Sequence, residues 1–123
     1  MTPAGFRRIA LGLDGATEGA HHAHPDFRVG GRIFATLGHP DRSHGMVSLT
    51  PEQQRSRVRV SPEAFRPVNG TWGEQGATLV RLSAVDEETL GDALTLAWQN
   101  AVAKGPSRSA KGTKKSKTRK TKR

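Results

Sequence analysis

The hydrophobic positions of this chain change period along its length, from helical spacing at both ends to short alternating runs between them. The clearest helical stripe lies toward the C-terminus, and its apolar positions are Leu90, Ala93, Leu94, Ala97, Trp98 and Ala101. They recur at helical intervals, which places them on one face. Asp86 is a suitable N-cap, so we expect a helix from there to about Ala103, with Gly105-Pro106 as the stop.

Two other segments begin with a capping hydroxyl followed by proline, a pair typical of helix starts. Thr2-Pro3 predicts a first helix whose apolar face ends near Leu13. Thr50-Pro51, with a glutamine three residues after the cap, predicts a polar, arginine-bearing helix to about Val58.

Short alternating runs fill the middle of the chain. Residues 24–37 are typical of a β-hairpin around Gly30-Gly31, and further strands are predicted at residues 46–49 and 78–83. Helices at both ends with strands between them favour an α+β fold, in which N- and C-terminal helices flank an antiparallel sheet.

Two loop lengths are compatible with this hairpin, and each gives a different strand register. A two-residue loop would pair Phe27 with Phe34, whereas a glycine-bulge loop one residue longer pairs Phe27 with Ile33. We prefer the longer loop because it gathers the apolar side chains on one face. The other face then carries Arg28, Arg32, Phe34 and Thr36.

The C-terminal segment differs in composition from the rest of the chain. Residues 1–103 hold ten Arg and eleven Asp or Glu, whereas residues 104–123 hold ten Lys or Arg and no acid, so the formal charge of +9 comes from this tail. Without large apolar residues to offset the entropy of ordering, the tail is predicted to be disordered. We therefore divide the chain into a domain at 1–103 and a Lys/Arg-rich tail at 104–123.

Several kinds of chemistry are disfavoured by the residues present. Cysteine is absent, which excludes disulfides and thiolate metal sites. His21, His22 and His24 are close enough to share a metal, but three histidines in four positions are also common in loops. No HExxH motif, Walker lysine or GxSxG elbow occurs. We expect neither an enzyme nor a cofactor, and a metal site only as a minor alternative.

Arginine and lysine are the candidate binding groups, because they contact phosphates and, beside an aromatic ring, also bases. The predicted contacts in the domain are Arg28, Arg32, Phe34, Arg55, Arg57 and Arg59. Those in the tail are Lys111, Lys114, Lys115, Lys117, Arg119, Lys120, Lys122 and Arg123. The alternative for the domain is an ordinary salt-bridged surface, with Asp26, Glu52 and Glu63 as partners. Trp72 and Trp98 are expected in the core.

Four stretches follow one another across the domain: HPDFRVGGRIFATLG, MVSLTPEQQ, FRPVNGTWGEQGATLVRL and VDEETLGDALTLAWQNAV. The hairpin FRVGGRIFATL and the pattern WGxxGxTxVxL are the most specific. Together they resemble the MmcQ/YjbR family of small bacterial proteins, with coverage from about Phe6 to Val102. The resemblance implies a frataxin-like, double-wing α+β fold and a DNA-binding role, and it implies no catalytic residues. The basic tail lies outside the family pattern.

The leading hypothesis is therefore DNA binding that is largely independent of base sequence, with affinity from the tail and any selectivity from the domain. The alternative is a small protein-interaction or regulatory module whose tail serves solubility or localisation. The sequence indicates neither a signal peptide nor a membrane span. We expect a cytoplasmic monomer, able to associate with the nucleoid, whose partner is DNA or another polyanion.

Overall fold

The computed structural model describes residues 1–21, 24–38 and 40–105, which form a six-stranded sheet and the helices packed on it. In chain order the elements are α1 (Pro3–Leu11), β1 (Thr17–His21), β2 (His24–Val29), β3 (Arg32–Leu37), β4 (His44–Ser48), α2 (Pro51–Val60), β5 (Phe65–Pro67), α3 (Thr71–Glu74), β6 (Ala77–Arg81), a 3-10 turn (Leu82–Ala84) and α4 (Glu87–Lys104). Among the described residues, none of the helices is both long and apolar enough to span a bilayer.

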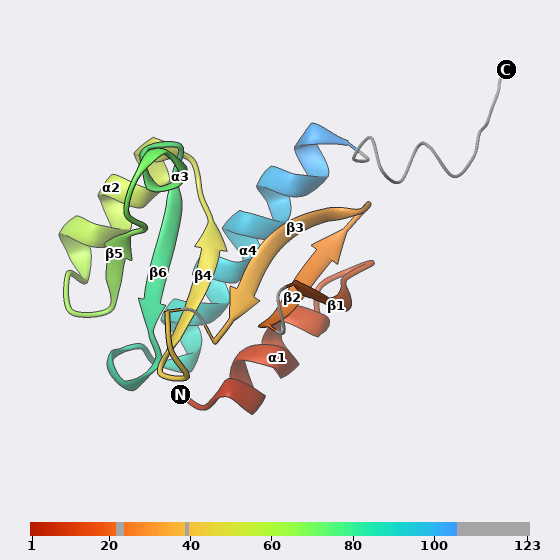
Figure 1. Cartoon of the computed structure of the whole chain (residues 1–123), viewed down its shortest axis with the longest axis horizontal. Coiled ribbons are helices and arrows are strands. Elements are labelled where there is room, and N and C mark those ends of the chain that lie inside the picture. Colours follow the sequence, from red (N-terminus) through yellow and green to blue (C-terminus); the bar gives the residue numbers. More distant parts are fainter. Residues whose placement is uncertain (22–23, 39, 106–123) are drawn as a thin grey trace, which may run out of the picture.

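The sheet is antiparallel, and its strand order is β1-β2-β3-β4-β6-β5. α4 lies behind the strands in Figure 1, and α1 and α2 pack beside it on the same side. Asn100 of α4 donates from Nδ2 to Gln53 Oε1 of α2 at 2.8 Å, which joins these two helices. In the described part of the chain, the opposite face carries no helix longer than one turn. The predicted α+β fold with an antiparallel sheet is confirmed.

The three longer helices begin at the capping residues predicted from the sequence. Thr2 caps α1, and Thr50 with Gln53 forms a complete capping box at the start of α2. At α4, the Asp86 carboxylate accepts a hydrogen bond from the Thr89 N–H at 2.7 Å, and this bond lowers the pKa of Asp86. α4 ends one residue later than predicted.

The β2–β3 hairpin has a different register from the predicted one. Val29 pairs with Arg32 across a two-residue turn, in which Gly30 and Gly31 have positive φ angles of 59° and 80°. Such angles are typical of the tight turns that join twisted strands. The predicted three-residue loop is therefore wrong.

An irregularity further along the hairpin accounts for the remaining difference. Arg28 pairs with Ile33, but Phe27 pairs with Ala35, so Phe34 is the extra residue of a β-bulge. Both Phe34 and Ala35 are fully buried in the core, although they are consecutive in a strand. The predicted exposure of Phe34 beside the hairpin arginines is wrong, because the bulge turns its ring toward the helices.

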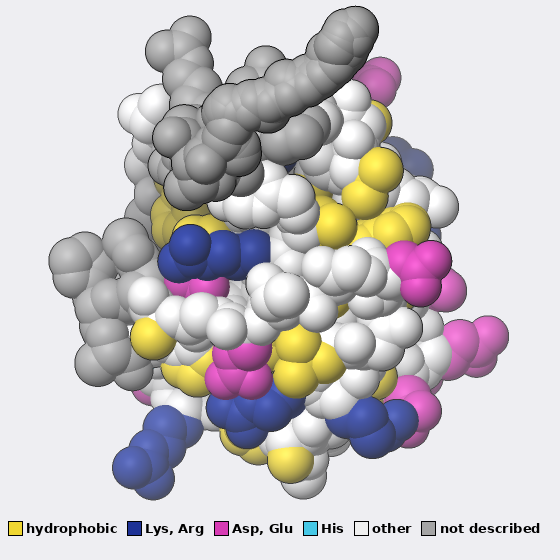
Figure 2. Space-filling model, turned by 90° about the vertical axis from the view of Figure 1, so that its right-hand side faces the viewer, with side chains coloured by type: hydrophobic (Ala, Val, Ile, Leu, Met, Phe, Trp, Pro, Cys, Tyr) yellow, Lys and Arg dark blue, Asp and Glu magenta, His cyan; other side chains and the backbone are white. Residues whose placement is uncertain are grey.

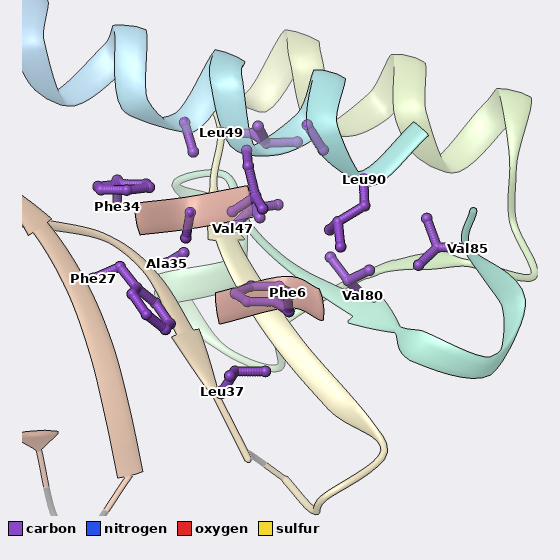
Figure 3. Close-up of a cluster of buried hydrophobic side chains, with 14 of the residues drawn as sticks. Phe6, Phe27, Phe34, Ala35, Leu37, Val47, Leu49, Val80, Val85 and Leu90 are labelled. Carbon is purple, nitrogen blue, oxygen red and sulfur yellow. The ribbon is translucent and has the colours of Figure 1, made fainter. Parts of the chain in front are cut away.

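The core fills the space between the sheet and helices α1 and α4 (Figure 3). The rings of Phe6 and Phe27 meet there in a tilted arrangement, with centroids 5.9 Å apart. The apolar stripe predicted for α4 is buried, apart from Trp98. Trp98 is half-buried against the core and donates from Nε1 to the Asp14 carbonyl oxygen at 2.8 Å.

Two strands are not predicted from the sequence. β1 has the sequence TEGAH, which lacks the alternation of apolar and polar residues that is typical of strands. β5 has only three residues, and Phe65 is its single buried position. Both lie at edges of the sheet, where pairing with one neighbour is enough to define a strand.

Polar contacts hold α2 against the β5–β6 end of the sheet. Gln54, the one buried residue of α2, donates from Nε2 to the carbonyl oxygens of Gly73 and Ala77, both at 2.9 Å. A Cβ at Gly73 would lie 1.5 Å from the Val68 carbonyl oxygen, so α3 must carry glycine there. Trp72 precedes this glycine and is 49% exposed, which contradicts its expected place in the core.

Gly45→Ala is expected to destabilise the fold by about 1–3 kcal/mol, because overpacking displaces well-packed groups. The added Cβ would lie 2.6 Å from the Phe6 ring and 3.1 Å from the Thr36 carbonyl oxygen. Gly91→Ala on α4 is the matched control, since nothing lies within 4 Å of its added Cβ. It should stabilise the protein by about 0.5–1 kcal/mol. Urea unfolding compares the two, and equal stabilities would contradict the packing of α1 over β4.

Candidate nucleic-acid interface

An ion pair lies on the helix-free face of β2. Asp26 and Arg28 alternate with the buried Phe27, so their side chains leave the strand on the opposite side from the core. Arg28 donates from Nε to Asp26 Oδ1 at 2.8 Å and from Nη2 to Oδ2 at 3.0 Å. These hydrogen bonds and the carboxylate charge raise the pKa of the Arg28 guanidinium.

Burial decides the role of this pair. The Asp26 side chain is 0% exposed, whereas that of Arg28 is 38% exposed. Gly19 of β1 provides the space, because a Cβ there would lie 2.9 Å from Asp26 Oδ1. A buried carboxylate needs a partner, so Arg28 first compensates Asp26, and only its remaining N–H groups can meet a ligand.

Arg32 lies at the hairpin tip beside the end of α4. Its Nε donates to the Gly105 carbonyl oxygen at 2.7 Å, a bond between residues 73 positions apart. The same side chain lines a hollow of about 270 Å³ between β3, β4 and α4. The residues lining it are Gly31, Arg32, Ile33, Ser48, Ala97, Asn100, Ala101 and Lys104. Two cations and no carboxylate among them make this hollow suitable for an anionic group.

The arginines of α2 lie toward the other end of the sheet. α2 packs on β5 and β6, whereas Arg28 and Arg32 belong to β2 and β3, across the intervening β4. Arg55 and Arg59 are exposed and Arg57 is half-buried. The structure therefore does not bring the predicted arginines together on one face.

Acidic side chains lie between the basic ones on the surface. On the face seen in Figure 2, Lys and Arg side chains are interspersed with Asp and Glu. Of the arginines predicted as contacts, only Arg28 forms an ion pair among the described residues, and its partner is Asp26. The alternative of a salt-bridged surface therefore holds for Arg28 alone. Arg7 with Glu18 and Arg8 with Glu87 form the other arginine ion pairs in the described part of the chain.

The strand registers reveal basic residues that the sequence did not single out. One row across the helix-free face consists of Gly19, Asp26, Thr36, Met46, Leu79 and Arg66, one from each strand. Next to it, His44 pairs with Arg81. His44, Arg66 and Arg81 line a second, smaller hollow. One sequence signal could have placed Arg81 on this face. In β6 the core residue Val80 is flanked by Leu79 and Arg81, and neighbours in a strand point to the opposite side.

The loop before β4 fixes the His44 ring. Its Nδ1 lies 2.9 Å from Asp41 Oδ1 and 3.0 Å from Ser43 Oγ. Hydrogen bonds from Ser43 and His44 lower the pKa of Asp41 well below its usual range. An ionised carboxylate only accepts hydrogen bonds, so Nδ1 is the donor and Nε2 remains for other contacts.

Other predicted sites fall wholly or partly outside the described residues. Among the described residues, no group of three metal-binding side chains is placed to hold an ion. His22 and the side chain of His21, which belong to the minor metal hypothesis, lie outside the description. The tail from residue 106 lies outside it as well, with its predicted disorder and its predicted contacts from Lys111 to Arg123.

The geometry is that of a two-layer α+β domain with basic groups at a hairpin tip and on a helix-free sheet face. The YjbR family model matches residues 11–100, and the protein therefore belongs to the YjbR family. A Deinococcus radiodurans protein, DR2400, described with the domain DUF419, has a similar structure, with a TM-score of 0.72. It is 18% identical over 90% of this chain and 86% of that chain, a likeness that shows the fold alone. No curated protein matches.

Arg28→Gln is expected to destabilise the protein by about 2 kcal/mol, because it leaves Asp26 buried without its cation. The loss is smaller than for a fully buried pair, since water reaches the guanidinium. Arg8→Gln breaks the exposed pair with Glu87 and should change stability by less than about 0.5 kcal/mol. Denaturant unfolding measures both. Similar values for the two variants would show that the Asp26 pair has no special structural role.

Proposed function

We propose that this protein binds DNA, or another polyanion, without catalysis and largely independently of base sequence. The basic tail supplies most of the affinity, and the β2–β3 hairpin tip supplies a fixed point of contact. The hydrogen bond from Arg32 to Gly105 carries this proposal, because it joins the hairpin to the start of the tail.

The charges around that bond support the arrangement. Arg32 and Lys104 line the hollow at the end of α4, whose lining has no acidic residue. Residues 106–123 follow directly and hold nine further Lys or Arg. A phosphate held by Arg32 and Lys104 would keep neighbouring phosphates of the same strand close to the start of the tail. This linkage raises their effective concentration around the tail cations.

The composition of the contacts favours recognition of the backbone over recognition of bases. Lysine acts on phosphate as a point charge, and phosphate contacts carry no base information. Phe34 is the aromatic ring predicted to stack on bases, but it is fully buried. The domain itself is close to neutral, with ten Arg and eleven Asp or Glu in residues 1–103. We therefore expect any selectivity to be modest and to come from the shape of the hairpin tip.

Removal of residues 108–123 tests the role of the tail and keeps Gly105 within the chain, so that its carbonyl oxygen remains a neutral acceptor for Arg32. If about five tail cations meet phosphates, the full chain should show a slope of log K against log salt of roughly −4 to −5. The truncated chain should bind much more weakly, with a slope of about −1 to −2. Fluorescence anisotropy with a duplex at several salt concentrations measures both. Unchanged affinity and slope after truncation would contradict the proposal.

The hairpin contact is tested in the full-length chain with the double variant Arg32→Gln/Lys104→Gln. It should weaken duplex binding about fivefold to tenfold and reduce the salt slope by about one to two. Arg42→Gln is the control, because Arg42 is exposed, has no ion pair among the described residues, and lies on the loop before β4. Equal affinities of the two variants would exclude the hairpin tip as a contact.

Transplanting residues 106–123 onto an unrelated neutral domain separates this proposal from that of a protein-interaction module. Under our proposal the transplant binds DNA more weakly than the full-length protein, because it lacks Arg32 and Lys104. An equally tight transplant would mean that the YjbR domain contributes nothing to DNA binding. The domain would then have another partner.

A further inference from the structure

We propose that the small hollow between β4, β5 and β6, on the helix-free face, binds a phosphoryl group through Arg66 and Arg81, with His44 as a third contact. This site lies apart from the hairpin tip, and the inference does not depend on the tail. Its residues come from three strands that are distant in sequence and adjacent in the sheet.

Strand pairing directs the three side chains to one side. His44 pairs directly with Arg81, and Arg66 pairs with Leu79, two positions before Arg81. Arg66 and Arg81 are therefore diagonal neighbours on one face, about 7–8 Å apart, with their Cβ atoms somewhat closer. Two guanidinium groups at that separation can converge on a single tetrahedral anion.

Both guanidinium groups are available to a ligand. Arg66 and Arg81 are exposed, and within the described residues neither forms an ion pair, in contrast to Arg7, Arg8 and Arg28. Each guanidinium carries five N–H donors in a planar fork, which fits two oxygens of one phosphoryl group. Arginine is the residue best suited to such bidentate contacts.

The surface of the hollow is mostly polar. Ala64, Phe65 and Leu79 also line it and are between 1% and 7% exposed, so its apolar part is small. The attraction comes from the arginine donors, because hydrogen bonds from a charged group are stronger than neutral ones. The volume of about 50 Å³ admits a small group and excludes a nucleobase or cofactor.

His44 adds a ring nitrogen whose orientation is already fixed. Its Nδ1 donates to Asp41, so Nε2 of the neutral ring is an acceptor and can meet a phosphoryl oxygen that carries a proton. The ring is 13% exposed at its side chain and lines the same hollow. It is therefore placed to contact a phosphoryl oxygen from the β4 side, while the two arginines approach from β5 and β6.

Glu63 is the one acidic residue that lines the hollow. Its carboxylate repels an anion and offsets part of the arginine charge. The site should therefore have modest affinity, and removal of this single charge should strengthen binding. A merely solvated pair of arginines would not give a site-specific gain of that kind.

Nuclear magnetic resonance of the full-length protein tests the site, because the Nε–H signals of Arg66 and Arg81 report on it separately from the tail. Titration with inorganic phosphate should shift both signals and saturate. Affinity should fall about tenfold or more in Arg66→Gln/Arg81→Gln and rise about threefold in Glu63→Gln. Arg8→Gln on α1, an exposed arginine outside the hollow, is the control and should leave phosphate affinity unchanged.

A second titration with a short duplex identifies the source of the phosphoryl group. Shifts at Arg66 and Arg81 with both probes indicate the backbone of a nucleic acid, and shifts with phosphate alone indicate a free phosphate compound; both support the site. Unshifted Arg66 and Arg81 signals, or equal phosphate affinity in the double variant and the control, would overturn it. Signals of Arg32 and Lys104 report on the hairpin proposal independently.

Discussion

The β-bulge opposite Phe27 is the constraint on which the arrangement of both sheet faces depends. Regular alternation would place Phe34 and Ala35 on opposite sides of β3, but the extra residue lets both pack against the helices. Burying a phenylalanine ring stabilises a fold by roughly 2–3 kcal/mol, which is enough to decide a register. The same register determines where the two hairpin arginines lie. Arg28 faces away from the core, and Arg32 is at the tip beside α4.

Local signals predicted the helices well, because a cap and an apolar stripe are read within one segment. The complete capping box at Thr50 and the buried face of α4 are examples. The hairpin register could not be predicted in the same way, since it depends on how Phe34 fits against a helix some 60 residues away. β1 has little strand character of its own and is defined by its pairing with β2. Trp72 is exposed because its neighbour Gly73 packs against the backbone of Val68.

In the candidate sites, too, local features were predicted from the sequence, whereas contacts between distant segments were not. Arg32 was predicted from its position in the hairpin, but its bond to Gly105 required the fold. Arg66 and Arg81 are each unremarkable in the sequence, and only the pairing of β5 with β6 makes them neighbours. Family motifs predicted membership of the YjbR family, and the family model confirms it over residues 11–100, yet neither carries information on which surface meets a ligand. The two proposed sites involve opposite faces of the sheet, so one ligand need not occupy both.

α2 has one buried residue, Gln54, and one partly buried apolar side chain against the core, that of Val58. Elements with few buried apolar contacts open at a lower free energy than the rest of a fold. The amide protons of α2 should therefore exchange with solvent through local opening, while those of β4 and α4 exchange only when the whole domain unfolds. Two hydrogen bonds from Gln54, to Gly73 and Ala77, and the bond from Asn100 to Gln53 thus limit how independently a helix carrying three arginines can move from the rest of the fold.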